Sequence, residues 1–203
     1  RSILEVCIDT IPCTFLLDTQ YRMRQTIAGF SNAYFYKEKL ITPLHLENTG
    51  VHITFIDTAG TGYNEISGSS GTSLQNEGEL QIVQKLIKAQ AIDTTVAAFI
   101  SPYSGQVAAA KDLLPPNMRV STIDSFQGQE KEIIILSLVR SNENGDIGFL
   151  KDYRRMNVAL TRAKEQLFVI GDSATIGPDP FYNSFLTYIE LHGEYRSGWE
   201  FEL

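Results

Sequence analysis

The chain has 203 residues, of which 43% are hydrophobic and 20% charged, and its formal net charge is −7 with a pI near 5.0. These values are ordinary for a globular chain with a sizeable core, and one α/β domain is the default at this length. The negative charge excludes a domain that holds nucleic acid tightly by bulk charge, but not one with a local basic groove. No apolar run is long enough to span a bilayer, so we expect no membrane association and no signal peptide.

Cys7 and Cys13 form no metal-binding pattern, and three scattered histidines do not complete one. We therefore expect no metal ligands in this chain and a cytoplasmic or other reducing intracellular location. Because the chain begins with Arg1 and not with methionine, we expect it to be processed or excised from a longer protein.

Short apolar runs rich in β-branched residues alternate with helical patterns along the chain. Strands are expected at 13–17, 51–56, 95–100, 119–123, 132–139 and 166–170, and helices near 25–36, 77–91, 104–114, 154–164 and 180–191. The runs VAAFI and EIIILSLV are nearly continuously apolar, as expected for parallel strands covered on both faces. The alternation predicts an α/β fold with a doubly wound, mostly parallel sheet and helices on both faces. We expect one domain over residues 1–203, ending in a helix and tail at about 178–203.

One stretch does not fit a compact core. Residues 58–78, TAGTGYNEISGSSGTSLQNEG, are rich in Gly, Ser, Thr and Asn, which predicts a flexible surface loop at about 58–76. The stretch ends in Ser73-x-x-Asn76-x-x-Glu79, where small polar residues are expected to cap the next helix.

Residues 153–164, YRRMNVALTRAK, predict a short amphipathic helix with three arginines. Its apolar face is made of Met156, Ala159, Leu160 and Ala163. Arg155 and Arg162, seven positions apart, are expected to project within about 20° of each other beside that face. Two interpretations remain open: a solvated basic face, or arginines held for a phosphate, which their planar charged fork suits.

Three further stretches carry candidate binding residues. In LDTQYRM, residues 17–23, the ring of Tyr21 can stack on a base while Arg22 reaches a phosphate. Taken alone, the pair favours a core tyrosine beside a surface arginine. In FISPYSGQV, residues 99–107, Ser101 ends a strand at the edge where open α/β sheets bind ligands, with Tyr103 following it. An ordinary turn with Tyr103 packed is the alternative there.

The third stretch, STIDSFQGQEKE at residues 121–132, is a polar turn after a strand. Thr122 and Ser125 offer hydroxyls, and Gly128 lets the backbone approach a ligand closely. Glu130 suits a ribose hydroxyl, the role of the acidic residue in dinucleotide sites. The alternative is a polar loop without a ligand.

Together and in this order, QYRMRQ…FYKEKL, SPYSGQ, TIDSFQGQE and GFLKDYRRMNVALTRAK resemble the second, C-terminal RecA-like domain of superfamily-one helicases. The nearest group contains the nonsense-mediated-decay RNA helicase and related DNA helicases, and the likeness runs from about residue 15 to 172. It implies a RecA-like three-layer fold in a P-loop NTPase-like domain that lacks the P-loop. Arg24-Gln25 departs from the family's His-Pro, and Ser101 replaces its threonine.

By position, the resemblance implies that Arg22 and Arg162 act on the γ-phosphate of ATP. The implied nucleotide site consists of Gln20, Tyr21, Arg22, Gly128, Glu130 and Arg162. The implied single-strand face consists of Ser101, Tyr103, Thr122 and Ser125. The roles of Arg155 and Asn157 stay open.

The resemblance thus implies the second motor domain of an ATP-dependent helicase or translocase acting on single-stranded DNA or RNA. Its partner would be an N-terminal RecA-like domain of the same protein, which supplies the phosphate loop and the ligands of Mg²⁺, so this chain alone is expected to be inactive. A 5′-to-3′ direction rests on the resemblance only. The alternative is a non-enzymatic module that keeps the fold and binds nucleic acid or protein.

Overall fold

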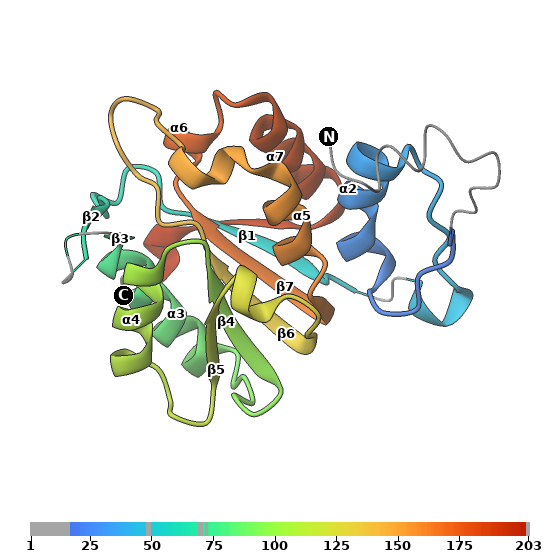
Figure 1. Cartoon of the computed structure of the whole chain (residues 1–203), viewed down its shortest axis with the longest axis horizontal. Coiled ribbons are helices and arrows are strands. Elements are labelled where there is room, and N and C mark those ends of the chain that lie inside the picture. Colours follow the sequence, from blue (N-terminus) through green and yellow to red (C-terminus); the bar gives the residue numbers. More distant parts are fainter. Residues whose placement is uncertain (1–16, 48–49, 69–70, 72, 202–203) are drawn as a thin grey trace.

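The computed structural model describes residues 17–47, 50–68, 71 and 73–201. Its main element is a six-stranded sheet in the order β5-β4-β6-β7-β1-β8, in which every neighbouring pair is parallel (Figure 1). The strands are β1 (Ile53–Asp57), β4 (Ala97–Ser101), β5 (Arg119–Thr122), β6 (Lys131–Ser137), β7 (Ala163–Gly171) and β8 (Glu194–Ser197). The helices are α2 (Gln25–Tyr36), α3 (Glu77–Ala89), α4 (Ser104–Leu113), α5 (Tyr153–Leu160), α6 (Ser173–Ile176) and α7 (Pro180–His192). Short 3₁₀ turns are η1 (Leu44–Leu46), η2 (Asp124–Phe126), η3 (Gly148–Lys151) and η4 (Gly198–Phe201).

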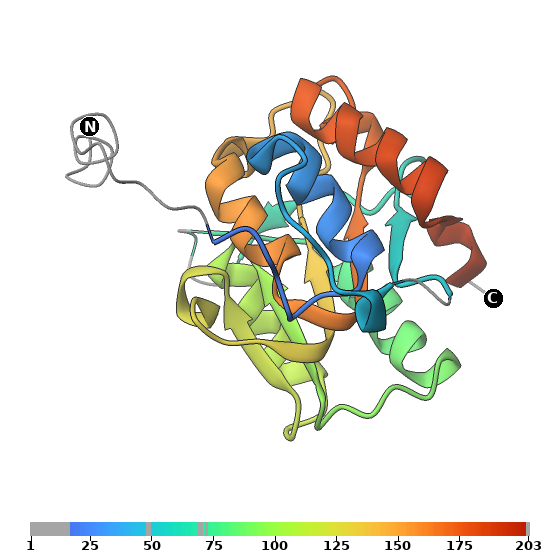
Figure 2. The same ribbon diagram turned by 90° about the vertical axis from the view of Figure 1, so that its right-hand side faces the viewer.

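Helices cover both faces of this sheet. In both views α2, α5 and α7 lie on one side of the strands, and α3 and α4 on the other (Figures 1 and 2). Two separate apolar cores match these two layers: one contains residues of α2, α5, α6 and α7, and the other residues of α3 and α4. The predicted α/β, RecA-like three-layer fold is confirmed.

Successive side chains of each central strand enter opposite cores, because residues alternate across a sheet. Phe55 of β1 packs in the first core and Ile56 in the second. In the same way, Ile134 of β6 lies in the first core and Ile135 in the second, and both are fully buried. A strand buried on both faces needs apolar residues at every position, which explains the continuous runs in the sequence.

The helix expected at 154–164 ends four residues earlier, at Leu160, and β7 already begins at Ala163. The hydroxyl of Thr161 donates to the carbonyl oxygen of Asn157 at 2.8 Å, which closes the last turn. The chain then continues as β7 and pairs with β6. Ala163 lies opposite Lys131, and the Lys131 amide donates to the Arg162 carbonyl. The expectation that Arg155 and Arg162 project from one helix was therefore wrong.

The Gly- and Ser-rich segment at 58–76 contains regular structure. β2 (Ile66–Ser67) and β3 (Leu74–Gln75) pair antiparallel, and the carbonyl oxygen of Leu74 lies 2.6 Å from where a Cβ on Gly105 would stand, so this hairpin packs closely on the start of α4. The predicted cap is confirmed at Asn76, whose side chain accepts from the Glu79 amide at 3.1 Å. The flexibility of the segment stays a prediction.

β8 was not predicted, because EYRS has no apolar run. It pairs parallel with β1 at the edge of the sheet, and η4 follows it with Phe201 packed in the second core. The expected strand at 13–17 and both cysteines lie outside the described residues, except Leu17, which is in no strand. Within the described part of the chain, no helix has the length and apolar character needed to cross a membrane.

Candidate functional site

The first candidate site lies at the amino ends of β6 and β7, where a carboxylate and three cations meet. Glu130 directly precedes β6 and Arg162 directly precedes β7. Arg22, which is 108 positions before Glu130, donates from Nε to Glu130 Oε2 at 2.5 Å and from Nη1 to the Thr161 carbonyl at 3.1 Å. Lys164 Nζ lies 3.4 Å from the other carboxylate oxygen of Glu130. The Arg22 hydrogen bond holds the pKa of Glu130 below its usual range.

Arg162 is fixed by neutral acceptors. Its Nε donates to the Val158 carbonyl at 2.8 Å, Nη1 to the Gln129 carbonyl at 3.3 Å and Nη2 to Thr161 Oγ1 at 3.2 Å. Among the described residues, no carboxylate lies within ion-pair distance of it. Partial burial lowers the pKa of Arg162, and the nearby charge of Arg22 lowers it further. Because both effects disfavour the positive charge of Arg162, a negative charge added beside it would be favourable.

Gln20 and Tyr21 complete this cluster. The Gln20 side chain braces the turn by accepting from the amides of Arg22 and Met23 at 3.0 and 2.9 Å. The Tyr21 side chain is 73% exposed, so it is no core tyrosine. It borders a surface pocket of about 510 Å³ whose other lining residues are Arg22, Leu46, Glu130, Lys164 and Glu165.

Arg24, which stands where the related motif has histidine, ties α2 to β7. Its Nε pairs with Glu165 Oε2 at 2.8 Å, and its amide donates to the Lys164 carbonyl at 3.0 Å. α2 begins at Gln25 as predicted. The missing proline therefore leaves the start of this helix in place.

Gly128 lies in the exposed turn between η2 and β6. Its φ is +82°, a conformation that glycine adopts without a steric penalty, and no atom lies within 4 Å of where a Cβ would stand. The open space leaves room for a ligand beside this backbone.

The second candidate site lies at the opposite end of the sheet, at the carboxyl ends of β4 and β5. Ser101 and Thr122 are register partners there, and Thr122 Oγ1 donates to Ser125 Oγ at 3.0 Å. Thr122 is half-buried and Ser125 is exposed. Ser101, by contrast, is fully buried and accepts from the Tyr103 amide at 3.3 Å, and Tyr103 is 2% exposed. The structure thus brings these four predicted residues together but presents only Thr122 and Ser125 to solvent.

Arg155 belongs to this second site and not to the first. Its Nε lies 3.4 Å from Asp124 and 3.3 Å from Asp152. Asn157, in the same helix, is half-buried, and its Oδ1 is buried without a hydrogen-bond partner.

A family model described as "AAA domain" matches residues 1–174 of the chain. The chain belongs to this family, among the superfamily-one helicases. DNA-binding protein SMUBP-2 of Mesocricetus auratus is 36% identical, over 92% of this chain and 21% of its own length. The Regulator of nonsense transcripts 1 homolog of Arabidopsis thaliana is 35% identical, over 87% of this chain and 16% of its own. DNA polymerase alpha-associated DNA helicase A of Saccharomyces cerevisiae is 36% identical, over 77% and 27%. The chain therefore spans between about a sixth and a quarter of these helicase-family relatives.

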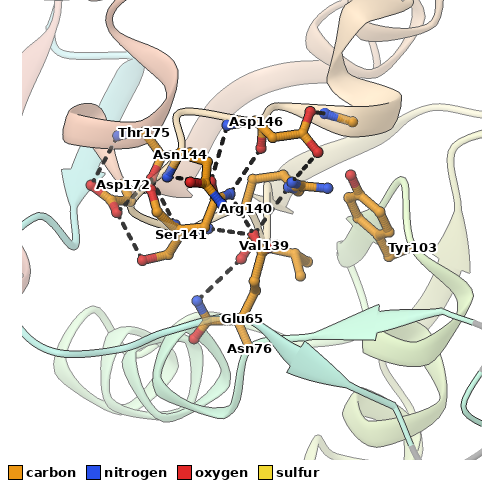
Figure 3. A network of polar contacts seen from close by, with 12 residues as sticks. Glu65, Asn76, Tyr103, Val139, Arg140, Ser141, Asn144, Asp146, Asp172 and Thr175 are labelled. Atoms are coloured by element: carbon orange, nitrogen blue, oxygen red, sulfur yellow. Dashed lines mark hydrogen bonds and ion pairs between the residues drawn. The ribbon is translucent and has the colours of Figure 1, made fainter.

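This helicase-family chain also contains a polar network that the sequence did not reveal, at the carboxyl ends of β6 and β7 (Figure 3). Arg140 is 6% exposed and pairs through Nε with Glu65 at 3.0 Å and through Nη2 with Asp146 at 2.9 Å. Beside it, Asp172 accepts from Ser141 Oγ at 2.8 Å. An arginine and a serine directly after the apolar run were the available signal.

Proposed function

We propose that the chain is the second motor domain of an ATP-dependent helicase or translocase, and that it supplies Arg22 and Arg162 to ATP bound between two domains. The observation that carries this proposal is the state of Arg162. Its guanidinium is held in place by three neutral acceptors, and no described carboxylate pairs with it. A fixed, unpaired arginine beside an exposed tyrosine and a second arginine suits the charge that grows on a transferring phosphoryl group.

Arg22 is already paired with Glu130, so a phosphate would have to compete for it. The two side chains are 32% and 39% exposed, and an exposed ion pair is worth about 0–1 kcal/mol. Charge-assisted hydrogen bonds from arginine to phosphate are stronger and can be bidentate. The exchange therefore costs little, and Glu130 would be freed for a ribose hydroxyl or for Lys164.

The phosphate loop and the Mg²⁺ ligands would come from an N-terminal RecA-like domain of the same protein. The sequence contains no G-x-x-x-x-G-K-S/T stretch, and the described residues include no group of three or more His, Cys, Asp or Glu that could hold a metal ion. This chain's part in the reaction is to place positive charge, while Gln20, Tyr21 and Gly128 shape the nucleotide pocket.

The single strand would lie at the other end of the sheet, along Thr122 and Ser125. Ser101 and Tyr103, both buried, would support this face from below and not touch the strand in the described conformation. Because the two faces belong to one rigid sheet, closure on ATP at one end would shift the strand contacts at the other. We propose a reducing intracellular compartment for this activity, because the sequence contains only two cysteines and they form no metal-binding pattern.

A non-enzymatic binding module is the alternative. It has no need for an unpaired arginine at the amino ends of β6 and β7. The natural full-length protein is expected to hydrolyse ATP with stimulation by single strands, whereas this chain alone should show no turnover because the phosphate loop is missing. Steady-state ATP hydrolysis on matched single-stranded DNA and RNA measures both. No ATP hydrolysis by the full-length protein, with or without single strands, would favour the module.

Thr122→Ala in the full-length protein is expected to weaken single-strand binding about ten- to a hundredfold, since a hydrogen bond to a charged phosphate contributes about 1.5–3 kcal/mol. Fluorescence anisotropy with a labelled oligonucleotide measures the dissociation constant. Thr187→Ala, the same change at an exposed position on α7, is the matched control and should leave it unchanged. Equal affinities for Thr122→Ala and the unmodified protein would show that this hydroxyl does not touch the strand.

A further inference from the structure

Glu130 divides its two carboxylate oxygens between two cations at the first candidate site. Its Oε2 accepts from Arg22 Nε at 2.5 Å, and its Oε1 lies 3.4 Å from Lys164 Nζ. The two contacts use different oxygens, so one can be lost while the other stays. Glu130 therefore keeps a cationic partner if Arg22 turns to another anion.

Lys164 is held in place by groups other than Arg22. Its Nζ donates to Glu132 Oε1 at 3.2 Å, and its carbonyl oxygen accepts from the Arg24 amide at 3.0 Å. The hydrogen bond to Glu132, and then that to Glu130, raises the pKa of Lys164, so its ammonium group stays charged around neutral pH. A departure of Arg22 would leave both the position and the charge of this lysine intact.

An irregularity in the sheet lies at this lysine. In the ladder between the two central strands, β7 has two residues, Lys164 and Glu165, where β6 has only Glu132. Such a one-residue β-bulge redirects side chains, and bulges are common next to active sites. The regular ladder is thus interrupted where Lys164 meets the two carboxylates.

The backbone on either side of Glu130 is fixed by Arg162. Arg162 Nη1 donates to the Gln129 carbonyl at 3.3 Å, and the Lys131 amide donates to the Arg162 carbonyl at 3.2 Å. The Glu130 side chain itself is 39% exposed, so it has room to reorient on this fixed backbone. An exchange of partners at Glu130 therefore needs no movement of β6 or β7.

A phosphate that approaches Arg22 carries the same sign of charge as Glu130. Arg22 cannot serve both anions fully, and a carboxylate left without a cation would repel the phosphate beside it. Lys164 offsets this repulsion, because it holds the carboxylate through the oxygen that Arg22 does not use.

We propose that Lys164 is a positioning residue that takes over the Glu130 carboxylate when Arg22 turns to the γ-phosphate of ATP. The carboxylate then pairs with the ammonium group, and the guanidinium is released for the phosphate. Lys164 acts through Glu130 and contacts no phosphate itself. The inference rests on the proposed function, and it adds the residue that makes Arg22 available for the reaction.

The test compares two ligands of the natural full-length protein in the presence of Mg²⁺: ADP alone, and ADP with aluminium fluoride, which mimics the transferring phosphoryl group. Lys164→Met removes the charge from a side chain of similar length. It is expected to weaken binding of ADP with aluminium fluoride about fivefold, the size expected of an exposed ion pair. Binding of ADP alone should stay unchanged, because Arg22 then remains on Glu130. Isothermal titration calorimetry measures both affinities.

Two variants serve as references for this measurement. Lys164→Arg keeps the positive charge and should retain both affinities. Lys111→Met makes the same change as Lys164→Met at an exposed position on α4, and it is the matched control without effect.

A second arm separates this role from a direct contact with phosphate. In a Glu130→Gln background the carboxylate is absent, so Lys164→Met should have no further effect on binding of ADP with aluminium fluoride. A fivefold loss that persists in that background, equal losses for the two ligands, or no loss at all would overturn the proposal. If Arg162→Ala still abolishes ATP turnover in that case, only this inference fails and the motor proposal stands.

Discussion

Arg162→Ala in the natural full-length protein is expected to lower ATP turnover about 10³-fold or more, with a much smaller change in ATP affinity. The charge that Arg162 would meet grows as the phosphoryl group transfers, so its loss raises the barrier more than it weakens ground-state binding. Three neutral acceptors position the guanidinium in advance, so little reorganisation is needed in the reaction. Single-turnover hydrolysis and equilibrium binding of a labelled nucleotide separate the two quantities.

Two further variants define this result. Arg162→Lys should rescue turnover poorly, because a point charge cannot reproduce both the fork and its contacts with Val158 and Gln129. Arg119→Ala removes an exposed arginine at the start of β5 and should hydrolyse ATP normally. Unchanged turnover in a folded Arg162→Ala protein would mean that these arginines form only a solvated basic surface.

The second large effect concerns Glu79, a fully buried carboxyl in the first turn of α3. Its Oε2 lies 2.5 Å from Ser137 Oγ, and both its oxygens accept from the Val139 amide at 3.0 Å. Burial raises the pKa of Glu79 to about 8, and the charge of Asp172 adds to this rise. The folded protein therefore favours the protonated acid.

The free energy of unfolding should consequently fall as pH rises from about 4.5 toward 8. Over this interval the unfolded chain releases the Glu79 proton while the folded chain retains it, at a cost of up to about 1.4 kcal/mol per pH unit. Glu79→Gln, a neutral side chain of the same shape, should remove this decline and become more stable than the unmodified protein as pH rises. Urea unfolding of this 203-residue chain at several pH values, followed by the fluorescence of Trp199, measures how the free energy of unfolding changes with pH.

Glu77→Gln is the matched control, since Glu77 is an exposed carboxylate in the same turn and its replacement should leave the slope unchanged. A free energy of unfolding that does not vary between pH 5 and 8, or that varies equally in Glu79→Gln, would show that Glu79 is ionised in the folded protein.

The sequence by itself determined the layers of the fold. VAAFI and EIIILSLV predicted β4 and β6, because a parallel strand covered on both faces needs apolar residues at successive positions. The cap at Asn76 followed from local chemistry, in which a side chain meets a backbone group a few residues away. The ordered motifs of the sequence also identified the helicase family.

Only the tertiary structure decided which of the predicted residues meet. Arg22 and Glu130 form an ion pair because α2 packs on the face of the sheet next to β7, a relation over 108 positions that no local pattern encodes. α5 ends where pairing with β6 outweighs helix propensity, and this moves Arg162 away from Arg155 to the opposite end of the sheet. Burial of Tyr103 and exposure of Phe149 are decided in the same way. Both residues are aromatic, so the sequence does not reveal which ring is buried. The packing of η3 against Arg140 and Tyr103 determines that Phe149 faces water.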